Sequence, residues 1–144
     1  MHMEDLVRLE TAYMAIPKFA KVNGYDLRAR FERNVDRGYW YVERRSAGDL
    51  AGFAAAYERD GTFYLWLLGV APPSRRKGVA ASLLDSFLEE GRARGYTRFT
   101  AKTHAGTPGM VRALEGAGFV RTATEPLDIG TDIQEEGYFY ERAG

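Results

Sequence analysis

The chain has 144 residues, a typical size for one domain with its own hydrophobic core, and we expect residues 1–144 to form that domain. Its 20 basic and 20 acidic side chains cancel, which argues against a nucleic-acid-binding protein that depends on bulk positive charge. The absence of cysteine excludes disulfides, thiolate metal sites and a cysteine nucleophile, and we expect no metal site.

Hydrophobic patterning and turn residues predict the elements of the first half of the chain. Residues 3–9 are expected to form a short strand, and residues 11–34 helical structure that is broken near Pro17 and Asn23-Gly24. Three strands rich in aromatic or apolar residues should follow: 39–45, 50–58 and 62–70. Because short turns join them, we expect these strands to form an antiparallel meander.

The second half of the chain alternates between helical and strand patterns. The expected elements are a helix over 78–94, a strand over 96–103, a helix over 107–116, and paired strands over 119–124 and 137–142. Thr107 suits the N-cap of its helix, and Gly118 suits a left-handed residue after its end. The predicted fold is α/β (α+β), with one mixed, mostly antiparallel sheet of about six or seven strands and helices on both faces.

A cationic loop lies between the strand ending at Val70 and the helix beginning at Gly78. The two prolines after the strand cannot donate to a sheet ladder, so the strand should stop there. Three consecutive cations follow: Arg75, Arg76 and Lys77. Free N–H groups at a helix start, the positive end of the helix dipole and nearby cations together favour an anion. With no Cβ at Gly78 the backbone can approach such a ligand closely, so we expect a pyrophosphate site.

The spacing Arg75-x-x-Gly78-x-Ala80, preceded by V-x-P, resembles the acyl-CoA loop R/Q-x-x-G-x-G/A of the GNAT superfamily of N-acyltransferases. Neither a dinucleotide-binding G-x-G-x-x-G nor a P-loop motif occurs. The stretch 113–119 parallels the family's N-x-x-A-x-x-L-Y-x-K-x-G-F pattern, with the final Gly-Phe intact. The element order is similar to the GNAT fold over nearly the whole chain. This resemblance implies that the strands 62–70 and 96–103 run parallel and then splay apart to hold acyl-CoA.

The resemblance also implies which residues bind acetyl-CoA. Backbone N–H groups from Arg76 to Ala80 would cradle the pyrophosphate, and Leu68 and Val70 would offer main-chain hydrogen bonds to the pantetheine arm. The region of Leu68 would also polarise the thioester carbonyl, which needs no particular side chain. The expected donor-binding residues are Leu68, Val70, Arg75, Arg76, Lys77, Gly78, Val79, Ala80 and Thr107.

The catalytic positions depart from the family pattern. Trp66 stands where many members have a glutamate as general base, and Leu114 where the usual tyrosine protonates the leaving thiolate. Thr107 replaces the asparagine at the helix start. General acid–base help is worth about 10²–10⁴-fold, and positioning can contribute more, so the reaction remains possible. Another residue or an ordered water then has to accept the proton of the amine.

Two residues are the catalytic candidates, His104 and Tyr138. His104 follows a predicted strand at the splayed edge, and imidazole is suited to proton transfer near neutral pH, although a loop histidine is often only an exposed polar residue. Tyr138 and Tyr140 are two apart on the final strand and share a face, where one acts as a substitute acid or both pack in the core. Glu58, at a strand end, acts through water or is simply solvated.

The charge of the acceptor stays open at this point. The acidic segment 125–136 would attract a cationic amine, whereas Arg28, Arg30 and Arg33 would contact an anionic acceptor. Alternatively, both the acidic segment and these arginines simply face solvent. By strand alternation Trp66 is expected to share a face with Tyr64 and Leu68, as the floor of the acceptor pocket or as a core residue.

These observations favour an N-acetyltransferase that transfers the acetyl group of acetyl-CoA to a primary amine by direct attack in a ternary complex. The alternative is an acyl-CoA-binding regulatory domain that has lost catalysis, a possibility raised by Trp66 and Leu114; a remote third is another type of nucleotide-binding domain. The expected partner is a small-molecule or peptide amine, with no nucleic acid and no membrane, and the protein a monomer or homodimer. With no membrane-length apolar run and no secretion signal, we expect a soluble cytoplasmic protein.

Overall fold

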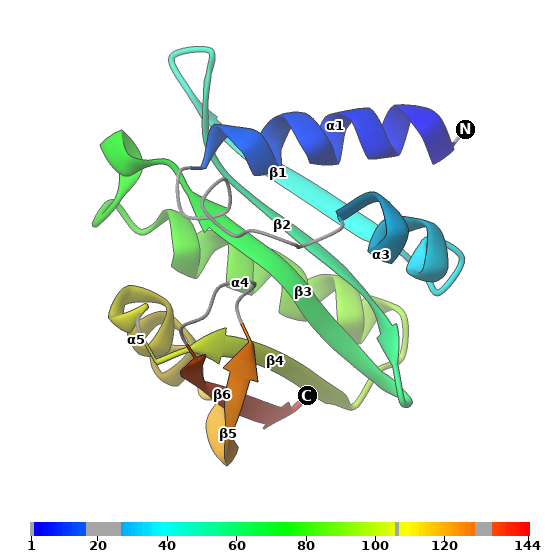
Figure 1. The fold of residues 1–144 in the computed structure, drawn as a ribbon, viewed down its shortest axis with the longest axis vertical. Coiled ribbons are helices and arrows are strands. Elements are labelled where there is room, and N and C mark those ends of the chain that lie inside the picture. The colour runs from blue at the N-terminus through cyan, green and yellow to red at the C-terminus, as the bar shows by residue number, and fades with distance from the viewer. Residues whose placement is uncertain (1, 17–26, 106, 129–133) are drawn as a thin grey trace.

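One mixed sheet of six strands organises the part of the chain that the computed structural model describes, residues 2–16, 27–105, 107–128 and 134–144 (Figure 1). The strands are β1 (Trp40–Ser46), β2 (Asp49–Arg59), β3 (Thr62–Val70), β4 (Arg98–His104), β5 (Val120–Asp128) and β6 (Gln134–Ala143). Their order in the sheet is β1-β2-β3-β4-β6-β5. The helical segments are α1 (His2–Ala15), α3 (Leu27–Asn34), the 3₁₀ turn η1 (Pro72–Ser74), α4 (Val79–Ala93) and α5 (Pro108–Gly116).

Helices cover both faces of the sheet, as predicted (Figure 1). Helices α1 and α3 lie on one face, where Leu9 and Phe31 belong to a buried cluster with Trp66. Helices α4 and α5 lie on the other face, where Phe87 and Leu114 are buried in a second cluster. Among the helices that the structure describes, none combines the length and apolar composition needed to cross a bilayer.

Helix α1 shows that the strand predicted over residues 3–9 is wrong. Leu6, Leu9, Tyr13 and Ile16 are buried, and their spacing of three and four residues is that of one helix face. Two acidic residues in the first turn favour the positive end of the helix dipole. The predicted breaks of the following helical stretch, at residues 17 and 23–24, lie outside the described residues.

The predicted meander and the parallel strand pair are confirmed. Strand β2 pairs antiparallel with both β1 and β3, whereas β3 and β4 run parallel. The parallel ladder extends only from the pair Phe63–Phe99 to the pair Leu65–Ala101, although both strands continue beyond it. Figure 1 shows the two strands side by side at one end and separated toward the other. We call this interruption of strand pairing between the carboxyl ends of β3 and β4 the gap.

A β-bulge in β3 changes the faces of the strand beyond Trp66. Leu65 pairs with Ala56 and Leu67 with Ala55, so that Trp66 has no residue opposite it. As a result Trp66 faces α1 and α3, whereas Leu68 belongs to the cluster on the side of α4 and α5. The prediction that Trp66 and Leu68 share a face is therefore wrong, because simple alternation fails at the extra residue.

Elements after the loop begin and end close to the predicted positions. Gly78 is the N-cap of α4, and Gly118 after α5 has the predicted left-handed backbone, with a φ of 89°. Strand β4 begins at Arg98, two residues after the predicted start, because Gly95 is left-handed and the N–H of Tyr96 donates to the Gly91 carbonyl. Strands β5 and β6 are each longer than predicted.

Candidate functional site

Most of the predicted site residues come together at the edge of the sheet where β3 and β4 end. Leu68 and Val70 lie at the end of β3, and the cationic loop follows directly. His104 is the last residue of β4, and Thr107 is the N-cap of α5. Because parallel strands end at the same edge of a sheet, elements distant in sequence meet here.

The cationic loop, residues 71–78, has a backbone held by local hydrogen bonds. The N–H of Ala71 donates to the Ala51 carbonyl at 2.8 Å, which extends the pairing beyond β3. The 3₁₀ turn η1 then reverses the chain. Arg76 and Gly78 both have left-handed backbones, with φ of 64° and 77°. A left-handed residue next to a helical one turns adjoining N–H groups toward one side, which is a form of anion-binding nest.

Several backbone N–H groups at the end of this loop and in the first turn of α4 have no hydrogen-bond partner within the described part of the chain. Within the described part of the chain, no acceptor lies in hydrogen-bonding range of the backbone N–H groups of residues 76–81. Gly78 provides no side-chain cap, and a Cβ built on it would meet no atom within 4 Å. The space beside Gly78 is therefore open, at the positive end of the helix dipole.

The cations of the loop strengthen the positive potential there. The side chains of Arg75, Arg76 and Lys77 are exposed, and no carboxylate among the described residues forms an ion pair with them. The arrangement suits a ligand with more than one negative charge, such as a pyrophosphate.

The turn after β4 is fixed by two threonine hydroxyl groups. The Thr107 hydroxyl donates to the His104 carbonyl at 2.8 Å, and the buried Thr103 hydroxyl donates to Thr107 Oγ1 at 2.9 Å. Thr107 is thus the N-cap by position, but its hydroxyl holds the turn instead of capping α5. The bulge at Trp66 adds one residue to β3, so counting ladder steps from the last parallel pair, Leu65–Ala101, places His104 level with Gly69 across the gap.

The two catalytic candidates lie on opposite faces of the sheet. Tyr138 pairs with Thr103 and packs against the cluster on the side of α4 and α5, whereas strand alternation places His104 on the other face. The guanidinium of Arg121 lies 3.6 Å from the ring centre of Tyr138. Tyr140 is a core residue whose hydroxyl donates to Glu115 at 2.8 Å; burial and this carboxylate raise the pKa of Tyr140.

The residues at the usual proton-transfer positions are packed in the interior. Leu114 is completely buried, and Trp66 packs edge-on against Tyr57, with 5.7 Å between the ring centres. Glu58 lies away from the gap: it pairs with Phe63 near the start of β3 and accepts a hydrogen bond from a tyrosine hydroxyl on the loop before β4. The acidic segment predicted over 125–136 includes residues 129–133, which lie outside the described part.

Lys102 is a residue of this region that the sequence alone did not single out. It is the first residue of β4 beyond the last parallel pair, and its ammonium lies 5.8 Å from the ring centre of Phe139. Burial lowers the pKa of Lys102, and the positive charges of Arg59 and Arg30 lower it further, while Glu125 acts in the opposite direction. One signal in the sequence could have identified Lys102. It alternates with the buried residues Phe99, Ala101 and Thr103, and it precedes His104 by two residues.

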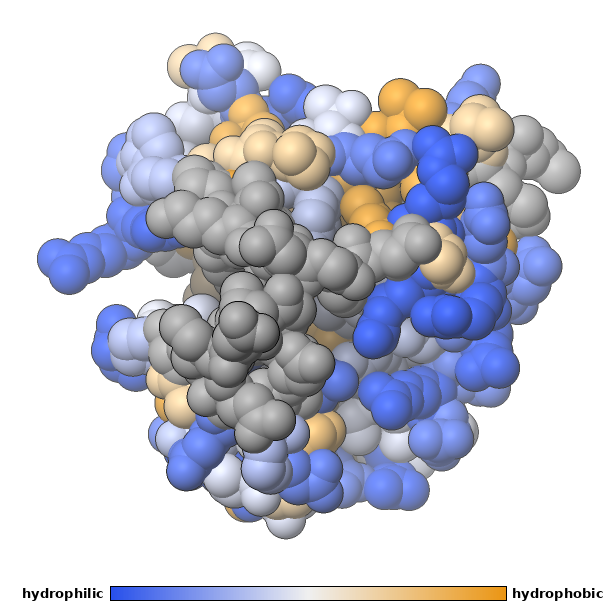
Figure 2. All heavy atoms as spheres, in the orientation of Figure 1, coloured by the Kyte–Doolittle hydropathy of each residue, from blue (hydrophilic) through white to orange (hydrophobic). Residues whose placement is uncertain are grey.

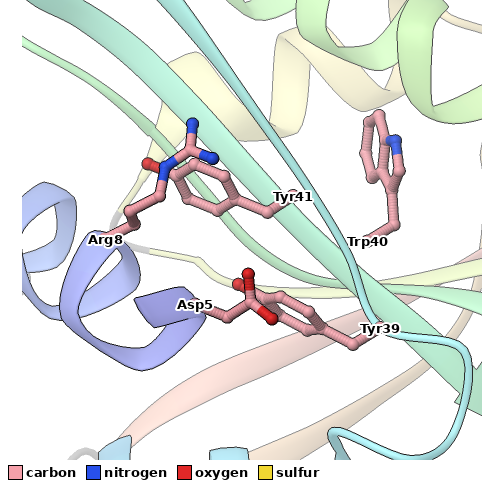
Figure 3. A pocket seen from close by; sticks show the side chains of 5 residues that line it. All are labelled: Asp5, Arg8, Tyr39, Trp40 and Tyr41. Atoms are coloured by element: carbon pink, nitrogen blue, oxygen red, sulfur yellow. The ribbon is translucent and has the colours of Figure 1, made fainter. Parts of the chain in front are cut away.

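A separate pocket of about 220 Å³ lies between α1 and the edge strand β1 (Figure 3). It is lined by Asp5, Arg8, Tyr39, Trp40 and Tyr41. The guanidinium of Arg8 lies 5.2 Å from the ring centre of Tyr41, and burial and nearby Asp5 raise the pKa of Tyr39. Strand β2 separates β1 from β3, so this pocket is not part of the site between β3 and β4.

The sequence matches the family described as Acetyltransferase (GNAT) family over residues 3–119. The comparison with curated proteins found no match for this sequence. Among solved structures, the fold is similar to that of the ribosomal-protein-S18-alanine N-acetyltransferase from Escherichia coli, with a TM-score of 0.76 and 18% identity over 97% of this chain and 88% of that one.

Two further solved structures show the same fold. Ard1 from Thermoplasma volcanium has a TM-score of 0.74 and 22% identity, over 96% of this chain and 92% of that one. The GNAT superfamily phosphinothricin acetyltransferase from Sinorhizobium meliloti, in complex with acetyl-CoA, has a TM-score of 0.67 and 20% identity, over 80% of this chain and 66% of that one.

Proposed function

Because the chain belongs to the GNAT family of acetyltransferases, we propose that it transfers an acetyl group from acetyl-CoA to a primary amine by direct attack in a ternary complex. The observation that carries this proposal is the run of backbone N–H groups over residues 76–81 that have no acceptor among the described residues. They lie beside three exposed cations, at the end of a splayed parallel strand pair. Residues 1–144 would act as one acyltransferase domain.

The donor half of the site follows from this loop. The N–H groups from Arg76 to Ala80 bind the pyrophosphate, with Lys77 close to the phosphates and Arg75 shaping the turn. Val70 lies beyond the parallel ladder and offers its main chain to the pantetheine arm, and the same role for Leu68 stays a prediction. The complex of the Sinorhizobium meliloti acetyltransferase with acetyl-CoA supports this choice of donor.

The chemistry needs one proton acceptor and one proton donor. The neutral amine attacks the thioester carbonyl carbon, the new C–N bond forms, the C–S bond breaks and CoA leaves as a thiol. We assign the amine proton to His104, or to a water beside it, on the face of the sheet opposite α4 and α5. Tyr138, on the face where α4 and its loop bind the donor, stays the predicted acid for the leaving thiolate.

Titration calorimetry with acetyl-CoA, followed by thiol release with a panel of amines, tests the proposal. The panel includes small primary amines and a peptide with N-terminal alanine, because the Escherichia coli structure neighbour is a ribosomal-protein-S18-alanine N-acetyltransferase. We expect binding of acetyl-CoA and thiol release with at least one amine. An intact protein that fails to bind acetyl-CoA at millimolar concentration contradicts the proposal.

A second candidate function is an acyl-CoA-binding regulatory domain without catalysis. The observation that favours it is the complete burial of Leu114 and the packing of Trp66, which leave no proton-transfer group at either usual position. Binding of acetyl-CoA without turnover of any amine would support this alternative. Turnover with a single primary amine excludes it.

Replacing His104 by alanine should lower kcat by about 100-fold or more, with acetyl-CoA affinity unchanged. The pH profile of kcat/KM should also lose its rise between about pH 6 and 8, because imidazole is the side chain that ordinarily titrates in this range. His104→Gln is the matched control, since glutamine keeps hydrogen bonding but carries no titrating proton. If both variants retain the wild-type profile, His104 is not the base.

A further inference from the structure

A row of paired residues crosses three strands at the level where the cationic loop begins. Arg44 of β1 pairs with Gly52 of β2, and Gly52 pairs with Val70 at the end of β3. The beginning of α4 lies against this row, because side-chain atoms of Val79 and Leu83 are 2.9 and 3.2 Å from a Cβ built on Gly52. Glycine at this position therefore allows α4 to lie directly on the sheet.

Arg44 connects the first two turns of α4 to the edge strand β1. Its Nε donates to the Ser82 hydroxyl at 3.0 Å, and its Nη2 donates to the Ser82 carbonyl at 3.4 Å and to the Ser86 hydroxyl. These two serines are four residues apart and share one face of the helix. Nη1 of the half-buried guanidinium also donates to the Glu43 carbonyl at 3.2 Å. The planar group is thus held by both elements, which fixes their relative position.

These contacts lie about one helical turn from the N–H groups that are proposed to bind the pyrophosphate. The N–H of Ser82 donates to the Gly78 carbonyl at 3.0 Å, whereas those of residues 79–81 have no acceptor among the described residues. At about 1.5 Å per residue, Ser82 is roughly 6 Å along the helix from Gly78. Figure 2 shows hydrophilic side chains that protrude on the left of the view, where Figure 1 places the cationic loop. This end of α4 is therefore held on its sheet side and open on its loop side.

We propose that Arg44 is a positioning residue of the donor site. Together with Gly52 it sets the place of α4 on the sheet, and α4 in turn keeps the N–H groups of residues 79–81 in range of the CoA pyrophosphate. Arg44 acts through α4 and does not itself contact the ligand. This inference rests on the proposed acetyltransferase function, and it adds to the donor site a residue of β1, outside the loop motif.

The test compares the binding of CoA with that of pantetheine, which has the same thiol arm but no pyrophosphate. Both ligands are titrated into the folded protein and followed by NMR of the backbone amides. Arg44→Gln should raise the Kd for CoA about tenfold, because the N–H groups lose their preorganisation, and should leave the Kd for pantetheine within about twofold. A purely structural role of Arg44 would change both Kd values alike and overturn the inference.

Two further variants separate the position of α4 from the charge of the arginine. Arg45→Gln removes an equal charge from the next residue of β1, whose exposed side chain pairs with Glu43 at 2.9 Å, and should leave both Kd values unchanged. Arg44→Lys retains the charge without the planar guanidinium, and should still weaken CoA binding. Full CoA affinity in Arg44→Lys would show that charge alone acts, and would overturn the inference.

Ser86→Ala tests whether Arg44 acts through α4. This variant removes one acceptor of the guanidinium and should raise the Kd for CoA, by less than Arg44→Gln does. In the double variant the two effects should add up to less than their sum, because both substitutions break one set of contacts. Fully additive effects would mean that Arg44 influences CoA binding by another route, against the inference.

Amide hydrogen exchange provides a readout that needs no ligand. The N–H of Ser82 should exchange about tenfold faster in Arg44→Gln than in the wild type, and at the wild-type rate in Arg45→Gln. Wild-type protein that binds no CoA would overturn the proposed function and leave this readout standing. Unchanged exchange of Ser82, or equal CoA affinity in Arg44→Gln and the wild type, would overturn the inference alone.

Discussion

Gly78→Trp is expected to weaken acetyl-CoA binding by about 100-fold while the protein remains folded. The open space beside Gly78 is where the proposed pyrophosphate lies, and an indole there would displace it from the N–H groups at the start of α4. Each hydrogen bond lost to a charged group costs about 1.5–3 kcal/mol of binding free energy, which corresponds to this loss of affinity. Titration calorimetry gives the affinity.

Gly95→Trp is the matched control for this prediction. Gly95 follows the other end of α4, has a similar left-handed backbone with a φ of 89°, and likewise has no atom near a built Cβ. Both variants should therefore lose a similar stability of about 1–2 kcal/mol, from the left-handed backbone. Equal acetyl-CoA affinity in the two variants would mean that the pyrophosphate is placed wrongly.

Gly91→Ala is expected to destabilise the protein by about 2 kcal/mol, although alanine favours a helix by about 1 kcal/mol over glycine. Gly91 lies in α4 against the sheet, and a built Cβ would be 2.2 Å from Phe99 and 2.9 Å from Phe63, both completely buried. Both rings are enclosed in the core and would have to shift, and overpacking of this kind costs about 1–3 kcal/mol or more. Urea unfolding measures the change.

The control for the helix is Gly116→Ala. Gly116 is the last residue of α5, and a built Cβ there meets no atom within 4 Å. This variant should be neutral or more stable by up to about 1 kcal/mol, since only helix propensity acts. A Gly91→Ala protein as stable as Gly116→Ala would show that α4 does not pack as closely on the sheet as described.

Local chemistry explains why the loop and its strand were predictable. Strand β3 has the predicted bounds, Thr62–Val70, because its apolar run is bounded by a glycine turn and by two prolines. Gly78 is left-handed, a conformation that glycine adopts without steric cost. Such signals act over a few residues, so the sequence contains all the information that they need.

The predictions from sequence are wrong where contacts between distant segments determine the local structure. The strand predicted over residues 3–9 is wrong because Leu6 and Leu9 are buried together on one face of α1, which packs on the sheet. The bulge at Trp66 depends on its pairing with β2, and no local pattern marks which residue is left out of the ladder. The predicted faces of β3 beyond the bulge are wrong for this reason.

The sequence by itself determined the family resemblance and the position of the cationic loop between β3 and α4, because both depend on short-range spacing and turn chemistry. Only the tertiary structure decided that His104 and Tyr138 lie on opposite faces, since this follows from the pairing of β4 with β6. It also placed the charges of Arg59 and Arg30 where they lower the pKa of Lys102. Charges from separate elements interact through space, and their combined effect exists only once the chain has folded.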